Sequence, residues 1–186
     1  GTVVDGTGSP PKLADVGIND DRISAFGDLG DSDAKQTINA YGKYVTPGFI
    51  DITNHSDTHL TLFKYPGQES LLTQGITTII GGNCGASLAP LGSGEAINAI
   101  RKWADPSEMN VNWATTAEYL KTLESLRLGV NFGTLTGYGT LRRGIIGDEV
   151  REFTGGEREE LKLLLGQALG EGSFGLSLGL AYGHER

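Results

Sequence analysis

The sequence predicts an α/β protein: the first half of an eight-stranded (β/α)8 TIM barrel, preceded by a small antiparallel β-sheet. Two observations predict this fold. Residues 1–45 alternate short apolar runs with turns rich in Asp and Gly, which is typical of small antiparallel sheets. From residue 46 onward, strand patterns alternate with helical patterns, which indicates parallel βαβ units with right-handed crossovers. We therefore expect two domains, residues 1–45 and residues 46–186.

In the first domain, turns such as residues 19–21 and 27–31 separate the apolar runs. Four strands are expected there, at residues 2–4, 14–18, 22–26 and 37–40.

The second domain reads as four strand–helix repeats. Strands are expected at residues 49–52, 76–80, 130–135 and 174–178, and helices at residues 68–73, 95–103, 116–126 and 157–169. Thr115 with Glu118, and Thr154 with Glu157, form the capping-box pattern at two helix starts. The last helix carries one apolar stripe at helical spacing, formed by Leu161, Leu164, Leu165 and Ala168. A complete barrel needs about 250 residues, so these four strands amount to roughly half of one.

Composition excludes several classes of partner. The net charge of −8 argues against nucleic acid and anionic membranes, because both select for basic surfaces. No apolar run approaches the length of a membrane span. A single Cys excludes an intramolecular disulfide and fits a reducing compartment, so we expect a cytoplasmic protein.

Two polar turns carry the candidate chemistry. His55 and Asp57 closely follow the strand expected at residues 49–52, and Cys84, the only Cys, follows the strand expected at 76–80. Because the carboxyl ends of parallel strands meet at one rim, His55 and Cys84 should lie there together, and both side chains are zinc ligands. We expect Asp57 to leave the chain on the same side as His55. The alternatives are a His bonded to a loop carbonyl and a Cys buried as a small hydrophobe.

Five segments, in order along the chain, resemble the N-acyl-D-amino-acid deacylases (D-aminoacylases) of the amidohydrolase superfamily. They are G-T-V-V-D-G-T-G at residues 1–8, P-G-F-I-D-I-T-N-H-S-D at 47–57, G-I-T-T-I-I-G-G-N-C-G at 75–85, G-Y-G-T-L-R at 137–142 and G-L-S-L-G-L-A-Y at 175–182.

The resemblance implies a zinc-dependent hydrolase that cleaves the linear amide bond of N-acyl-D-amino acids. It also implies that the first sheet is half of a β-sandwich completed from the C-terminus. Further zinc-ligand His residues and an Asp general base would lie on later strands, beyond residue 186. The chain is thus expected to be an N-terminal fragment, to need the C-terminal half of the same protein as its partner, and to be inactive alone.

The resemblance assigns candidate roles residue by residue. Cys84 and His55 correspond to metal ligands. Thr53 stands where the family has the first His of an H-x-H pair, and Thr53 and Asp57 are possible ligands or neighbours of the metal. The substrate would be contacted by Arg142, Ser177 and Tyr182.

Two substitutions keep other functions open. Thr53 and Tyr138 replace two His of the family pattern, which favours a non-catalytic amidohydrolase-like binding protein. A related hydrolase of cyclic amides or dipeptides is a third reading, although the G-N-C-G segment at residues 82–85 favours the deacylases. For Arg142, a surface ion pair is the alternative to a clamp on a substrate carboxylate.

Overall fold

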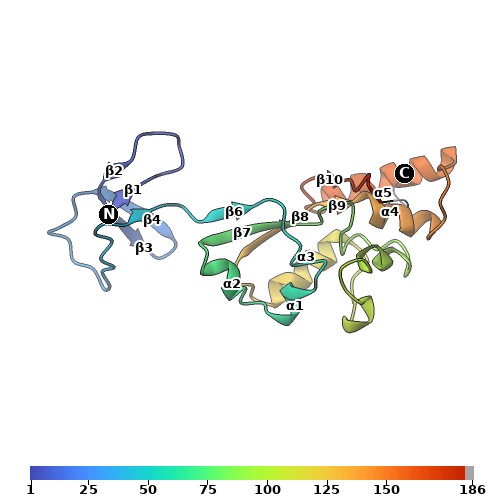
Figure 1. Cartoon of the computed structure of the whole chain (residues 1–186), viewed down its shortest axis with the longest axis horizontal. Coiled ribbons are helices and arrows are strands. Elements are labelled where there is room, and N and C mark those ends of the chain that lie inside the picture. Colours follow the sequence, from blue (N-terminus) through green and yellow to red (C-terminus); the bar gives the residue numbers. More distant parts are fainter. Residues whose placement is uncertain (183–186) are drawn as a thin grey trace. The chain divides into compact units, whose positions relative to one another are not determined.

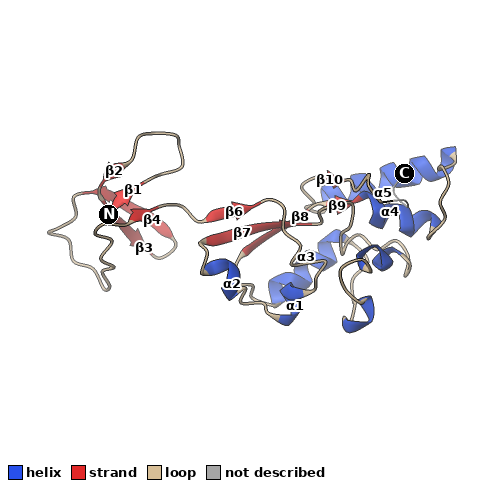
Figure 2. Cartoon of the chain, viewed as in Figure 1, coloured by secondary structure: helices blue, strands red, loops and turns tan. Residues whose placement is uncertain are grey.

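The computed structural model describes residues 1–182, and the chain divides into two compact units, Gly1–Gly48 and the residues from Phe49 onward (Figure 1). The division follows Gly48 rather than residue 45. Strands alone make up the first unit, whereas every labelled helix belongs to the second (Figure 2).

The first unit contains two small sheets rather than the single antiparallel sheet expected. Strand β1 (Thr2–Val3) pairs antiparallel with β2 (Lys12–Leu13) and parallel with β5 (Tyr44–Val45). Strands β3 (Asp15–Asn19) and β4 (Arg22–Gly27) form a separate antiparallel hairpin.

The strand expected at residues 37–40 is wrong, because the backbone that pairs with β1 comes later in the chain. The Thr2 amide donates to the Lys43 carbonyl, and the Val4 amide donates to the Val45 carbonyl, both over 2.9 Å. Short apolar alternation marks a potential strand but does not name its partner.

The second unit is built on parallel strands. Strands β6 (Phe49–Asp51), β7 (Ile76–Gly81) and β8 (Asn131–Thr134) lie side by side in chain order and are parallel throughout (Figure 1). After Leu135 the chain continues as β9 (Thr136–Gly137), which pairs parallel with β10 (Leu176–Ser177). Each of the four expected strand regions therefore contains a parallel strand, and β9 is an additional short strand just after the third region.

Short helical segments join these strands. They are α1 (Thr61–Lys64), α2 (Glu69–Leu72), the 3-10 segments η1 (Ala96–Ile100) and η2 (Pro106–Glu108), α3 (Thr116–Ser125), α4 (Tyr138–Ile146) and α5 (Gly155–Gly170). Both predicted capping boxes are confirmed, at the starts of α3 and α5. The predicted stripe of α5 is half-buried or buried. None of the helices within residues 1–182 is long and apolar enough to cross a bilayer.

Some helices of the structure differ from those expected, and α1 and η2 are short additional segments. Residues 95–103 form only the short 3-10 segment η1 rather than an α-helix. Helix α4 was not expected, because Gly139 and Gly144 lower its helix propensity. It forms nonetheless because it packs against η1 and α5, with Leu141 and Ile146 buried.

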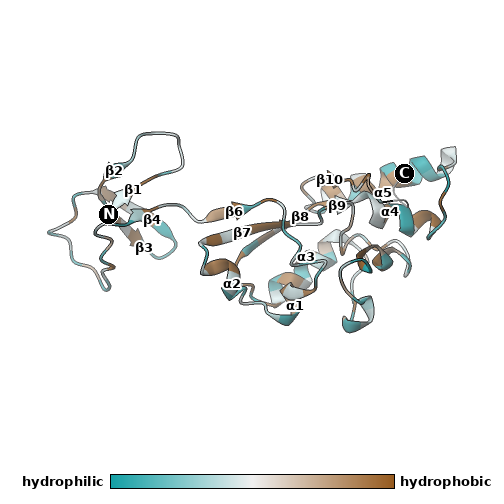
Figure 3. Ribbon diagram, viewed as in Figure 1, coloured by the Kyte–Doolittle hydropathy of each residue, from teal (hydrophilic) through white to brown (hydrophobic). Residues whose placement is uncertain are grey.

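The core of the second unit lies between the sheet and its helices. Ile79 of β7 and Leu62 of α1 are fully buried in it, together with Tyr119 of α3. Trp113 stacks on Phe63 with ring centroids 5.8 Å apart, and its indole nitrogen donates to the Leu88 carbonyl over 2.7 Å. Figure 3 shows β6 and β7 as predominantly hydrophobic strands. The core holds β7 through Ile79, and β6 is held by its parallel pairing with β7. The turns that follow these two strands carry the site.

Candidate metal and substrate site

The turn after β6 is organised by its own polar side chains. One carboxylate oxygen of Asp51 accepts from the Thr53 amide over 3.1 Å, and the other accepts from the Asn54 side-chain amide over 2.9 Å. The Asn54 side-chain oxygen in turn accepts from the Ser56 amide over 2.8 Å. These bonds satisfy the backbone as the strand ends, and they hold His55 in the middle of the turn.

The turn after β7 needs its glycines. Gly82, Cys84 and Gly85 all have a left-handed backbone, with φ of 72°, 55° and 75°. A Cβ on Gly82 would lie 2.0 Å from the Leu135 carbonyl oxygen, so no side chain fits there. The Asn83 side chain donates to the carbonyls of Asn54, over 3.2 Å, and of Ile80, over 2.7 Å, which ties this turn to the preceding one.

These two turns bring His55 and Cys84 together. The Cys84 sulfur lies 3.6 Å from Nε2 of His55. Two ligands of one tetrahedral zinc, at the usual zinc–sulfur and zinc–nitrogen distances, lie about 3.5 Å apart. The spacing of this pair therefore fits a shared zinc ion, and the expectation that both side chains reach one rim holds in the structure.

The surroundings of His55 keep its Nε2 available as a ligand. Nδ1 lies 3.2 Å from the Thr58 hydroxyl, which itself donates to the His55 carbonyl over 3.4 Å. This arrangement favours the tautomer with a proton on Nδ1 and a lone pair on Nε2, facing the sulfur. Partial burial, followed by the charges of His59 and Lys102, lowers the pKa of His55 and favours the neutral imidazole that metals bind.

Asp57 does not share the rim with His55. Its carboxyl group is fully buried and accepts from the Gly82 amide over 2.7 Å. Burial raises the pKa of Asp57 to about 6. The expectation that its side chain leaves with that of His55 is wrong, because β6 ends at Asp51 and the chain then turns, with the Leu60 amide bonded to the Asp57 carbonyl over 2.9 Å. Asp57 therefore stabilises the Cys84 turn from inside the protein, through its hydrogen bond with the Gly82 amide. Thr53, by contrast, is exposed to solvent.

Two aromatic side chains, Trp103 and Tyr182, lie beside His55 and Cys84, and the sequence predicts only Tyr182 near the site. The rings of His55 and Trp103 lie 5.1 Å apart, and Tyr182 meets Trp103 edge-on at 6.4 Å. The Lys102 ammonium lies 3.2 Å from the centre of the Tyr182 ring and 3.3 Å from the Cys84 carbonyl oxygen. Tyr182 is thus near the site as expected. The sequence alone does not mark Lys102 and Trp103 as neighbours of the site, because neither belongs to a motif.

Arg142 has a different environment from either one expected. Helix α4 turns it inward, and its guanidinium donates to the carbonyls of Glu149 and Arg151 and lies 4.9 Å from the centre of the Phe153 ring. It is only 2% exposed, so a surface ion pair is wrong. These contacts give Arg142 a structural role in holding the chain that follows α4.

Ser177 is also buried, and its hydroxyl contacts the backbone of the Cys84 turn. It accepts from the Gly85 amide over 3.1 Å and donates to the Gly82 carbonyl. Within residues 1–182, His, Cys, Asp and Glu form no group of three or more that could hold a metal. The described part of the chain therefore supplies two ligands, fewer than the three protein ligands of a catalytic zinc.

Comparison with known proteins finds relatives that match nearly the whole chain. Over 98% of its length the chain is 38% identical to an N-acyl-D-glutamate deacylase from Alcaligenes xylosoxydans xylosoxydans. Over 97% it is 37% identical to an N-acyl-D-aspartate deacylase from the same organism. The whole chain superposes on the crystal structure of a D-aminoacylase, described as defining a novel subset of amidohydrolases, with a TM-score of 0.83 and 36% identity. Over nearly its whole length the chain is thus similar to N-acyl-D-amino-acid deacylases. No protein-family model matches it.

The chain corresponds to only part of these relatives. It spans 36% of the length of each of the two curated deacylases and 38% of the D-aminoacylase chain. It also matches an N-acyl-D-glutamate deacylase from Bordetella bronchiseptica, solved with zinc and a phosphonate inhibitor, with a TM-score of 0.84, 35% identity and 37% of that chain covered.

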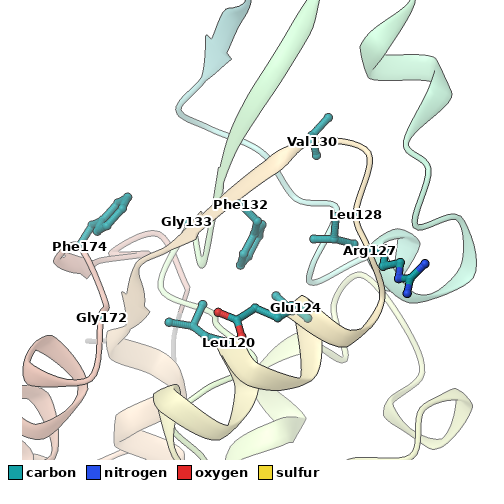
Figure 4. A pocket seen from close by; sticks show the side chains of 10 residues that line it. Leu120, Glu124, Arg127, Leu128, Val130, Phe132, Gly133, Gly172 and Phe174 are labelled. Carbon is teal, nitrogen blue, oxygen red and sulfur yellow. The ribbon is translucent and has the colours of Figure 1, made fainter. Parts of the chain in front are cut away.

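A separate hollow of about 490 Å³ lies between β8 and α3. Phe132 of β8 faces Leu120 and Glu124 of α3 across it, with Phe174 at its edge (Figure 4). Its lining is mainly apolar and it starts near Val130, before the strand, so it is distinct from the rim that holds Cys84.

Proposed function

We propose that the complete protein is a zinc-dependent hydrolase that cleaves the amide bond of N-acyl-D-amino acids. The observation that carries this proposal is the 3.6 Å approach of Cys84 to His55 at the ends of two adjacent parallel strands. The parallel strands of the second unit would form the first half of its (β/α)8 barrel, whose active site lies at the carboxyl ends of the strands. The first unit, Gly1–Gly48, would be half of a β-sandwich.

Cys84 and His55 would hold the zinc, which when bound polarises a carbonyl and lowers the pKa of bound water. The chain's own contribution is to hold the two ligands. The Thr58 hydroxyl orients the imidazole, and the glycine-flanked turn directs the thiol toward it. Trp103 and Tyr182 would exclude water from one side of the bound N-acyl group. Thr53 is a poor zinc ligand, which favours one metal over two.

The remaining ligands and the general base would come from later parts of the protein. The 186-residue chain alone is therefore expected to release no D-amino acid from N-acyl-D-amino acids above background. Zinc-dependent release by the isolated chain would contradict this expectation. A cytoplasmic location fits the free thiol at Cys84, since zinc-binding thiols need reducing conditions.

Zinc content and D-amino acid release from the complete protein test the proposal. Replacing Cys84→Ser should remove most bound zinc, measured after dialysis by atomic emission, together with hydrolysis of N-acetyl-D-amino acids. His59→Ala is the matched control, because His59 is exposed and its ring lies 6.3 Å from that of His55. Wild-type zinc content in the Cys84→Ser protein would overturn the ligand assignment.

One observation favours a second candidate, a non-catalytic binding protein of the same fold. Thr53 and Tyr138 stand at two His positions of the family pattern. The two candidates are separated by the same assay, because a binding protein would retain an N-acyl-D-amino acid without releasing acetate. A hydrolase of cyclic amides or dipeptides would instead release product from those substrates in a parallel assay.

A further inference from the structure

The hydroxyl of Ser177 bridges the two backbone groups that flank Cys84. It accepts from the Gly85 amide over 3.1 Å and donates to the Gly82 carbonyl. We propose that Ser177 is a positioning residue that holds the Cys84 turn in the form that directs the thiol toward His55. This inference rests on the proposed role of Cys84 as a zinc ligand.

The turn needs such support because its backbone is unfavourable for Cys84. Cys84 has a Cβ and a φ of 55°, a left-handed backbone that L-residues adopt only at a cost in energy. Such strain persists only where the surroundings fix it. Asp57 holds the Gly82 amide from one side, and Ser177 holds the Gly82 carbonyl and the Gly85 amide from the other.

The bridge joins the turn to a distant strand. Ser177 belongs to β10, whose pairing with β9 fixes its position, and it is only 8% exposed. Both hydrogen-bonded partners are backbone groups inside the protein. Without the hydroxyl, a buried amide and a buried carbonyl would lose their partner, and the turn could relax to satisfy them elsewhere.

These hydrogen bonds favour a positioning role for Ser177 over the substrate contact that the sequence predicts. The single hydroxyl proton already goes to the Gly82 carbonyl, so it is not available to donate to a substrate. Replacing a residue that orients a metal ligand without touching the metal commonly weakens metal binding about 10- to 100-fold.

Cobalt binding to the metal-free complete protein tests the inference, because a thiolate bound to Co²⁺ gives a charge-transfer absorption band. Ser177→Ala should weaken Co²⁺ binding about 10- to 100-fold and reduce that band, while Ser177→Thr, which keeps the hydroxyl, should restore both. Ser173→Ala is the matched control. Ser173 is a buried hydroxyl in the same segment, but it bonds to Thr136 and to the Thr134 and Gly175 carbonyls rather than to the Cys84 turn.

A second measurement needs no metal. The rate at which iodoacetamide alkylates Cys84, followed by peptide mass spectrometry, should rise severalfold in metal-free Ser177→Ala and stay unchanged in Ser173→Ala. Wild-type Co²⁺ affinity and band in Ser177→Ala, in a protein whose band is lost in Cys84→Ser, would overturn the inference and leave the proposed function standing. If the unaltered protein shows no thiolate band, the ligand assignment fails, and an unchanged alkylation rate in Ser177→Ala would then overturn the positioning role separately.

Discussion

Residues 1–48 and residues 49–182 both contain short strands, but only in the second unit do the strands pack against a hydrophobic core. Within residues 1–48, Val3 is the one buried side chain, while Leu13 is 87% exposed and Ile23 is 74% exposed. In the second unit, Leu62, Ile79 and many other side chains are fully buried around Tyr119.

The difference between the units shows that tertiary contacts, rather than local turn hydrogen bonds, determine the geometry of the candidate site. Turns of the first unit, such as the one in which the Asp5 carboxylate accepts from Thr7, are exposed and satisfied locally. The Cys84 turn and its continuation are held by buried groups from three separate segments: Asn54 and Asp57 after β6, Thr140 of α4 and Ser177 of β10. A shape imposed by tertiary contacts is more sensitive to substitution than one made within a local turn.

The largest effect is expected from a pair of glycine substitutions with matched backbone. Both Gly82 and Gly8 have positive φ, but a Cβ on Gly82 would meet the Leu135 carbonyl, whereas Gly8 has open space around it. Gly82→Ala should therefore lower the free energy of unfolding by more than about 4 kcal/mol, and Gly8→Ala by about 1–2 kcal/mol of local strain.

Trp103 and Trp113 are the only Trp residues, so tryptophan fluorescence during urea denaturation reports the second unit alone. For Gly8→Ala, hydrogen exchange of the Val4 amide, which donates to Val45, reports the first unit. Equal losses from the two substitutions would remove the contrast between the units.

A leucine pair should give the next largest difference. Leu62 is fully buried in the core and Leu13 is 87% exposed. Leu62→Ala should cost about 2–5 kcal/mol through lost burial and the cavity left behind, and Leu13→Ala should stay within about 0.5 kcal/mol. The same two measurements apply. A cost below about 1 kcal/mol for Leu62→Ala would show that the core is looser than its burial implies.

The buried carboxyl of Asp57 should make stability fall as pH rises. Its pKa is about 6 in the folded chain and 3.8 for an ordinary Asp, so between these values the folded state holds a proton that the unfolded state has lost. One pKa unit corresponds to about 1.4 kcal/mol, so the penalty grows to about 3 kcal/mol between pH 4 and pH 6 and stays constant above. Asp57→Asn should remove this fall in urea denaturation curves followed by tryptophan fluorescence.

The first unit offers the opposite sign as a control. Hydrogen bonds from Thr7 lower the pKa of the exposed Asp5. Its contribution is therefore present above the ordinary Asp pKa and lost as pH falls, and Asp5→Asn should leave the pH 4–6 slope unchanged. A slope that persists in Asp57→Asn would show that another group titrates there.

The smallest difference is expected from two threonines. At the start of α5 the Thr154 hydroxyl accepts from the Glu157 amide, and the Glu157 carboxylate accepts from the Thr154 amide over 2.7 Å. Thr154→Ala should cost about 1 kcal/mol. Thr7, whose hydroxyl bonds only within an exposed turn, should cost less than about 0.5 kcal/mol when replaced by Ala. Thermal melts followed by circular dichroism at 222 nm should resolve the first change and not the second.

The sequence was sufficient to place Cys84 beside His55. Each follows one of two neighbouring parallel strands, and the direction of a parallel strand fixes which edge its following turn reaches. It was also sufficient for the capping boxes, because these depend on residues three apart.

The sequence was not sufficient where long-range packing decides. Nothing local shows that α4 would turn Arg142 toward the Glu149 and Arg151 carbonyls, or that Asp57 would be buried beneath Gly82. That residues 44–45 rather than 37–40 form a strand, paired with β1, likewise depends on contacts between separate segments. A motif names the residues near a site, but the direction of each side chain is set by neighbours distant in sequence.

The separation of Ser177 from the turn it contacts has a consequence for how the protein is made. The hydroxyl lies 92 residues after Gly85 and 95 after Gly82. A ribosome adding about 5–20 residues per second needs about 5–20 s to cover that distance. During this interval the nascent chain already contains Cys84 while the strand that completes its turn has not been synthesised. The thiol environment is therefore finished late in translation, and premature termination before residue 177 would leave the Cys84 turn without its bridge.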